Sequence, residues 1–148
     1  MNAQKFTKKA LEAVNSAQSI ALENQNMQIA PEHLLYALVD QEGGLIPQLL
    51  KKSGVDTDNL LSLIDSAINK IPAVSGSGRE PDKIYISPLT DKIFSEAERL
   101  ANSMRDEYVS VEHLMLAIFD HETDDIRSIF RSLGITKDAF LTELKKVK

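Results

Sequence analysis

The sequence predicts an all-α protein in which one helical unit occurs twice, and three observations support this fold class. Apolar residues recur at helical spacing along most of the chain, whereas the single alternating run, residues 83–87, is too short to found a sheet. The segments 31–40 and 111–120 read PEHLLYALVD and VEHLMLAIFD, and their shared Glu-His-Leu motif starts at Glu32 and again at Glu112, 80 residues later. Residues that begin and end helices recur at the same offset, as expected of a duplicated unit.

The repeat also predicts the domain organisation. We expect a single domain over residues 1–148, with repeat 1 at 5–70, a linker at 71–86 and repeat 2 at 87–148. The linker is rich in Pro, Gly and Ser, a composition typical of flexible connections. Small Ala and Gly residues favour close helix contacts, so we expect the two repeats to pack together about a pseudo-twofold axis.

The first helix of each repeat has a recognisable start. Residues 7–24 carry Ala and Val at helical spacing, and Thr7 is placed to be the N-cap, whose hydroxyl satisfies an early backbone donor. The equivalent helix of repeat 2 starts at Ser87, an N-cap that is followed by Pro88 at the first helical position.

The later helices are bounded by capping and helix-ending residues in both repeats. The second helix opens at a proline in repeat 1 and after a serine in repeat 2, glycine ends the third in a left-handed C-cap, and a polar N-cap starts the fourth. In repeat 1 these residues are Pro31, Gly54 and Asp56. In repeat 2 they are Ser110, Gly134 and Thr136.

Composition and charge exclude several classes of function. The 17 Lys and Arg against 22 Asp and Glu give a formal net charge of −5, which argues against a nucleic-acid partner because such binding requires a basic surface. The absence of cysteine rules out disulfides and thiolate metal sites and fits a reducing compartment. The N-terminus lacks a signal-peptide core, and no apolar run approaches the ~20 residues that span a bilayer. We expect a globular domain in the cytoplasm that contacts neither membrane nor nucleic acid.

Catalytic and metal-binding motifs are missing. The sequence has no G-x-x-x-x-G-K-[ST] loop, no H-E-x-x-H and no G-x-S-x-G, so we expect neither an enzyme nor a cofactor in this segment. His33 and His113 are related by the repeat, which favours two equivalent surface or half-buried histidines over a metal site. His121 stands among acidic residues whose spacing is not that of a calcium loop, which indicates a solvated acidic loop.

Several segments together resemble the Clp N-terminal domain family. They are FTKKALEA near the start, PEHLLYAL, QEGG, the KSGVD turn, and VEHLMLAI one repeat later, and the resemblance covers essentially the whole chain. Within the family, the segments at 40–44 and 71–76 are most similar to the ClpB type, an ATP-driven disaggregase. The ClpC and ClpA unfoldases that serve the ClpP protease are the next most similar.

The resemblance implies an accessory domain that precedes two ATPase modules of a hexameric ring, where ATP and Mg are bound. It implies that the domain binds unfolded or aggregated proteins and passes them to the ring, and that the Hsp70 system is a partner of the full-length protein. The alternative is a domain of the ClpC or ClpA type, which docks adaptor proteins or phosphoarginine.

The resemblance also implies site residues. Residues that match the substrate-handling positions and the neighbouring apolar groove of ClpB-type domains are Thr7, Tyr85, Ile93, Phe94, Asp106 and Glu112. For the alternative, Glu32 and Glu112 match carboxylates that bind phosphoarginine, and a carboxylate suits a guanidinium by charge and geometry. On this basis Phe94→Ala is expected to weaken client binding and to leave the fold intact.

Four of these residues also have a purely structural interpretation. Thr7 can serve only as a helix cap, and Glu112 lies in a first helical turn, where the helix dipole favours an acidic residue. Asp106 can be a turn residue, and Phe94 adjoins an apolar seam and can belong to the core.

Overall fold

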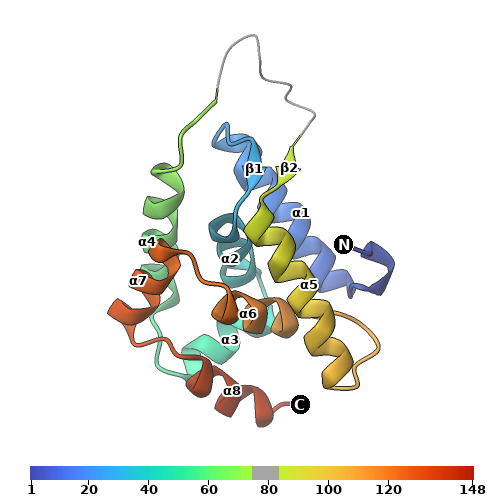
Figure 1. Cartoon of the computed structure of the whole chain (residues 1–148). Coiled ribbons are helices and arrows are strands. Elements are labelled where there is room, and N and C mark those ends of the chain that lie inside the picture. Colours follow the sequence, from blue (N-terminus) through green and yellow to red (C-terminus); the bar gives the residue numbers. More distant parts are fainter. Residues whose placement is uncertain (75–83) are drawn as a thin grey trace.

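The helices follow the same order in both halves of the chain (Figure 1). The structure is a computed structural model that describes residues 1–74 and 84–148. The elements of this part of the chain are η1 (Ala3–Lys5), α1 (Lys8–Glu23), β1 (Gln28–Ile29), α2 (Pro31–Asp40), α3 (Leu45–Lys52), α4 (Thr57–Asn69), β2 (Tyr85–Ile86), α5 (Pro88–Ser103), α6 (Val111–Asp120), α7 (Asp124–Leu133) and α8 (Lys137–Lys145). The prediction of a mostly helical, duplicated fold is confirmed.

The predicted caps of the first helices are confirmed. Thr7 Oγ1 accepts a hydrogen bond from the backbone N–H of Ala10 at 3.1 Å, and Ser87 Oγ accepts one from Thr90 at the same distance. Pro88 is the first residue of α5 and needs no backbone hydrogen-bond partner there. The two repeats therefore begin their first helix by the same chemistry.

The ends of the later helices also match the sequence predictions. Gly54 and Gly134 have φ of +87° and +69°, in the left-handed region that glycine enters without steric cost. Asp56 and Thr136 then cap α4 and α8 through their side-chain oxygens. The local sequence therefore determines where these helices stop and restart.

The prediction that residues 83–87 form no strand is wrong. Tyr85–Ile86 forms β2, which pairs in parallel with β1 so that Ile86 lies opposite Ile29. An isolated parallel bridge between Phe6 and Val109 is the repeat equivalent of this pair. Strands of two residues are too short for side-chain alternation to reveal them, and their partners are distant in the chain. β2 also ends the predicted linker, and residues 75–83 of that linker lie outside the described part of the chain.

The two halves pack through reciprocal helix pairs. Within each half, α1 packs on α2 and α5 on α6; between the halves, α1 contacts α6 while α2 contacts α5. Helix α3 likewise contacts α8, and α4 contacts α7. Figure 1 shows α2 and α6 in the interior, flanked by α1 and α5 and by the later helices. These reciprocal contacts agree with the predicted pseudo-twofold arrangement.

One apolar core runs through both repeats. Leu34 and Leu38 of α2 and Leu114 and Ile118 of α6 are fully buried members of a single contiguous cluster. Burial of apolar surface at about 25 cal/mol per Å² is the main source of stability here. The helices of the described residues include none with the length and apolar character to cross a membrane.

Candidate functional site

The loop between α5 and α6 is the point where several candidate residues meet. The chain turns at Arg105, whose φ is +59°, and the backbone N–H of Asp106 then donates to Ala101 O at 2.9 Å. The equivalent loop of repeat 1 has the same turn, with a φ of +56° at Gln25. A positive φ is unusual for residues with a side chain, so its presence at both loops indicates a required shape.

A buried histidine holds Asp106 in place. His113 Nδ1 accepts a hydrogen bond from the backbone N–H of Ser110 at 2.9 Å, and Nε2 lies 2.8 Å from Asp106 Oδ2. Since Nδ1 acts as an acceptor, the proton lies on Nε2, which donates to the carboxylate. Asp106 is therefore held by a side chain with no exposed surface.

His33 has the equivalent arrangement in repeat 1. Its Nδ1 accepts from the backbone N–H of Ala30 at 2.9 Å, and its Nε2 lies 2.9 Å from Asn26 Oδ1. Burial lowers the pKa of His33 to about 4, because a charged imidazolium in the core loses its hydration. The expectation of surface or half-buried histidines is wrong: both form part of a buried helix-capping arrangement.

An ammonium group joins Asp106 to Glu112. Lys148 Nζ donates to Asp106 Oδ2 at 2.5 Å and lies 3.2 Å from Glu112 Oε2. The hydrogen bonds from Lys148 and His113 lower the pKa of the Asp106 carboxyl. Burial opposes the charge on Lys148, but its two carboxylate partners outweigh this effect and raise the pKa of the ammonium. The sequence interpretation missed Lys148, because nothing local relates it to a loop 42 residues earlier.

Thr7 approaches the same loop from the N-terminal side. Its backbone N–H donates to Val109 O at 2.9 Å, and Val109 N–H donates to Lys5 O at 2.7 Å. The structure therefore brings Thr7, Asp106 and Glu112 around one loop, although Thr7 lies in the other repeat.

Two apolar side chains on this loop are exposed. Met104 and Tyr108 retain 37% and 48% of their accessible surface. The sequence interpretation missed both, because only the fold shows which apolar residues of a loop stay outside the core. We define the loop surface as Thr7, Met104, Asp106, Tyr108 and Glu112.

Tyr85 lies away from the loop surface. It is 56% exposed on β2, before α5 begins, whereas Asp106 follows the end of α5. A helix of 16 residues is about 24 Å long, and β2 and the α5–α6 loop lie at opposite ends of α5 (Figure 1).

The expectation that Ile93 and Phe94 line an exposed groove is wrong. Both are buried, Phe94 to 1% exposure, and the Phe94 ring meets the edge of Phe6 with centroids 6.0 Å apart. These residues lie on the face of α5 that packs into the core, beside Ala97. Their apolar character reflects packing, and a client cannot reach them in this structure.

Glu32 is already engaged within the chain. It is buried, and its Oε2 accepts a hydrogen bond from Thr123 Oγ1 at 2.8 Å. The residue 80 positions before Thr123 is Gly43, which has no hydroxyl, and the equivalent Glu112 interacts with Lys148 instead. Phosphoarginine binding at Glu32 and Glu112 stays a prediction that requires displacement of both partners.

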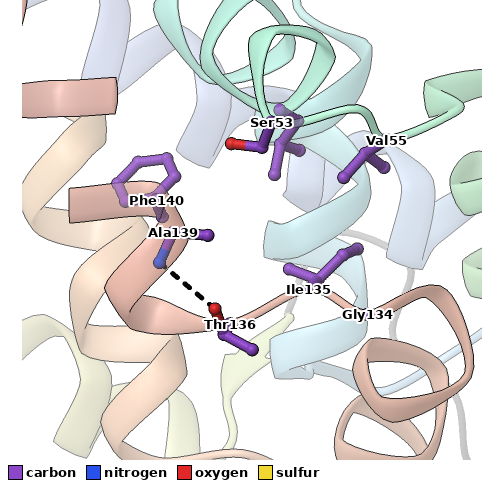
Figure 2. A pocket seen from close by; sticks show the side chains of 8 residues that line it. Ser53, Val55, Gly134, Ile135, Thr136, Ala139 and Phe140 are labelled. Carbon is purple, nitrogen blue, oxygen red and sulfur yellow. Dashed lines mark hydrogen bonds between the residues drawn. The ribbon is translucent and has the colours of Figure 1, made fainter. Parts of the chain in front are cut away.

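Two of the concave sites lie away from the α5–α6 loop. A gap of about 10 Å³, room for one water molecule at most, separates the α3–α4 turn from the turn between α7 and α8. Figure 2 shows the Thr136 cap and Phe140 on one side of this gap and Ser53 and Val55 on the other. A larger hollow of about 370 Å³ lies between the α2–α3 loop and the start of α4. Neither includes a residue of the loop surface. A small hollow of about 60 Å³ adjoins that surface, between Lys5, the end of α5, and Glu107 and Val109 of the loop.

Residues that could hold a metal ion do not gather in the described ranges 1–74 and 84–148, where no group of three His, Asp or Glu side chains is suitably placed. The chemistry of the loop surface is therefore that of carboxylates, hydroxyls and apolar contacts.

Comparison with protein families matches residues 5–133 to the Clp repeat (R) N-terminal domain. The chain belongs to the Clp N-terminal domain family. The chaperone protein ClpB of Clostridium tetani is 36% identical over 148 residues, and that of Bacillus cereus is 37% identical over the same length. Each match covers 100% of this chain and 17% of the relative, so this Clp N-domain spans about a sixth of the curated relatives it matches.

Solved structures of other Clp N-domains share the fold. The Hsp104 N-terminal domain from Candida albicans has a TM-score of 0.80 at 24% identity, covering 94% of this chain and 88% of that one. The N-domain of ClpV from Vibrio cholerae has a TM-score of 0.75 at 20% identity, covering 96% and 86%. A complex of a ClpV N-domain with a VipB peptide has a TM-score of 0.68 at 20% identity, covering 95% and 89%. At these identities the likeness establishes the fold alone.

Proposed function

We propose that this Clp N-domain is the substrate-recognition domain of a ClpB-type chaperone and binds unfolded or aggregated polypeptide at the loop surface. The observation that supports this proposal best is the convergence of Thr7, Asp106 and Glu112 on one loop. These three residues match positions linked to substrate handling in ClpB-type domains, and they come from both repeats. The peptide complex of a ClpV N-domain is an independent reason to expect polypeptide binding in this fold.

The loop surface suits a heterogeneous client. Met104 and Tyr108 offer exposed apolar area to hydrophobic segments, and the partly exposed carboxylate of Asp106 suits a basic side chain. Glu112 is buried, and its carboxylate is reached through the contact that Lys148 makes. An open face with few anchors removes little apolar surface from water, so we expect affinities on the order of tens of micromolar. Weak sites become effective when several copies are presented together.

The whole protein places this domain in a larger cycle. The domain captures clients, and two ATPase modules in a hexameric ring hydrolyse ATP with Mg and thread the client through the pore. The Hsp70 system delivers aggregated clients in the bacterial cytoplasm, and the isolated domain is monomeric and requires no cofactor.

Amide chemical shifts during a titration with a permanently unfolded protein test this proposal. We expect shifts at Thr7, Asp106, Tyr108 and Glu112, with the apolar part of the binding persisting in high salt. Tyr108→Ser should weaken binding about fivefold, and the matched control Tyr85→Ser, at the other end of α5, should leave binding unchanged. If Tyr85→Ser weakens binding and Tyr108→Ser does not, the client site lies at β2 and not at the loop surface. No shifts at millimolar client would refute client capture by this domain.

The same titration separates the alternative function. Shifts at Glu32 and Thr123 on addition of free phosphoarginine, with none on addition of unfolded protein, would favour a docking module of the ClpC type. The Glu32–Thr123 hydrogen bond argues against that outcome, since a guanidinium must first displace the hydroxyl.

A further inference from the structure

The segment that follows the last helix of each repeat returns to the loop between that repeat's first two helices. In repeat 1, Val74 N–H donates to Gln25 O at 2.8 Å, and Asn26 Nδ2 donates to Pro72 O at 3.4 Å. In repeat 2, Lys148 reaches Asp106 across 42 residues. The contact in repeat 1 is made by neutral groups, whereas the contact in repeat 2 joins an ammonium to two carboxylates.

Lys148 differs from the other lysine after α8 that forms an ion pair. Its side chain is only 31% exposed, and its Nζ contacts carboxylates on both the α5–α6 loop and the first turn of α6. Lys146 is 64% exposed and pairs with Glu143, one turn earlier in α8. The Lys148 contact therefore ties the C-terminal segment to the loop surface, and Lys146 does not.

We propose that Lys148 is an internal competitor for the loop surface: its ammonium occupies the Asp106–Glu112 pair, and a basic side chain of a client must displace it. This inference rests on the proposed function, because it concerns the same surface. The pair already holds a primary ammonium, so a client lysine is a chemically matched replacement. Displacement frees the C-terminal segment, so that client binding loosens the chain beyond α8.

A client can displace Lys148 because the ion pairs that Lys148 forms are weak. An ion pair near the protein surface contributes little to stability, because water competes for both partners and the lysine side chain loses conformational freedom. A client that also contacts Met104 and Tyr108 buries apolar surface there, and this adds binding free energy that Lys148 alone does not provide. In repeat 1 the equivalent residue, Asn26, is neutral and buried, so a client ammonium group has no bound ammonium to replace there.

The test uses the chain 1–148 and two unstructured peptides of equal length and apolar content, one with several lysines and one with glutamines in their place. Lys148→Met removes the ammonium and keeps an apolar side chain, and Lys146→Met is the matched control. We expect Lys148→Met to bind the lysine peptide about two- to fivefold more tightly at low salt, the glutamine peptide unchanged, and Lys146→Met to behave like the parent chain. Binding of the lysine peptide to the parent chain should also raise the backbone mobility of residues 146–148, measured by heteronuclear NOE.

The outcomes separate the two proposals. If the parent chain binds the peptides but Lys148→Met binds the lysine peptide equally or less tightly, competition is refuted while client capture stands; Lys148 would then orient Asp106 and Glu112. If Lys148→Met tightens both peptides equally, the exchange of ammonium groups is refuted. If neither the parent chain nor any variant binds either peptide, both client capture and competition by Lys148 are refuted.

Discussion

Asn26 and Asp106 occupy equivalent positions in the two repeats, and each accepts a hydrogen bond from the Nε2 of a buried histidine, at 2.9 and 2.8 Å. Asn26 is neutral and buried, whereas Asp106 carries a charge and also binds Lys148. The Asn-to-Asp difference, together with Lys148, therefore gives repeat 2 a charged group where repeat 1 has a neutral, buried one.

Lys148 should control the ionisation of Asp106. In the parent chain the pKa of the Asp106 carboxyl should lie below its ordinary 3.8, because the hydrogen bonds from Lys148 and His113 favour the ionised form. Lys148→Met should raise this pKa, and Lys146→Met should leave it unchanged. Carboxyl carbon shifts followed against pH measure the effect. An unchanged pKa in Lys148→Met would show that the ion pair does not persist in solution.

The same shift has a defined effect on stability. A carboxyl with a lowered folded-state pKa stabilises the fold above its unfolded pKa and loses this contribution as pH falls through the folded value. The contribution from Asp106 should therefore be present at neutral pH and disappear only below about pH 3.8, and Lys148→Met should lose the part of it that the Lys148 hydrogen bond supplies, while His113 keeps the rest.

His33 should make stability fall at mildly acidic pH. Its pKa is about 4 in the fold against 6.5 in the unfolded chain, so between these values the unfolded chain binds more protons. The free energy of unfolding should thus decrease as pH falls from 6.5 towards 4, by up to about 3 kcal/mol in total. Urea unfolding between pH 7 and pH 5 measures this slope, before most carboxylates titrate. His33→Gln should flatten the slope, and an equal slope in that variant would assign it to other groups.

Removal of the Thr7 hydroxyl should destabilise α1 whether or not Thr7 contacts clients. Thr7→Ala should lower the free energy of unfolding by about 1 kcal/mol, because the N–H of Ala10 loses its acceptor. Thr7→Ser keeps the acceptor and should stay close to the parent chain, and Ser87→Ala should show a similar loss at the equivalent cap. Urea unfolding gives the stabilities, and client affinity measured well below the transition shows whether Thr7 has a further role. A stable Thr7→Ala chain would contradict the capping role.

Substitution of Phe94 should act on stability first. Phe94→Ala removes a buried ring that packs on Phe6, and such substitutions cost about 3–5 kcal/mol through lost burial and the cavity left behind. Phe94→Leu keeps most of the volume and should cost clearly less. Thermal or urea unfolding measures both. An unchanged stability together with weaker client binding would place Phe94 at the surface, contrary to the structure.

The elements with local signals could be predicted from the sequence. The caps at Thr7, Ser87, Asp56 and Thr136 depend on one side chain bonding to a backbone group three residues away, so residue type and position suffice. The turn at Gly134 is predictable for the same reason, since a left-handed residue is needed where the helix ends. The repeat itself required only that two segments be compared.

The site was only partly predictable. Thr7, Asp106 and Glu112 were named through family resemblance, and the structure shows that they surround one loop. Ile93 and Phe94 were misplaced because an apolar residue at helical spacing looks the same in sequence whether it faces the core or a groove.

By itself, then, the sequence determined the helices, their caps and the duplication, because these depend on interactions within a few residues or on self-similarity along the chain. Only the tertiary structure decided which partner each carboxylate has, which apolar residues are exposed, and that Lys148 lies between Asp106 and Glu112. Such contacts join residues from different helices, and their formation depends on how the two repeats pack and not on any local pattern.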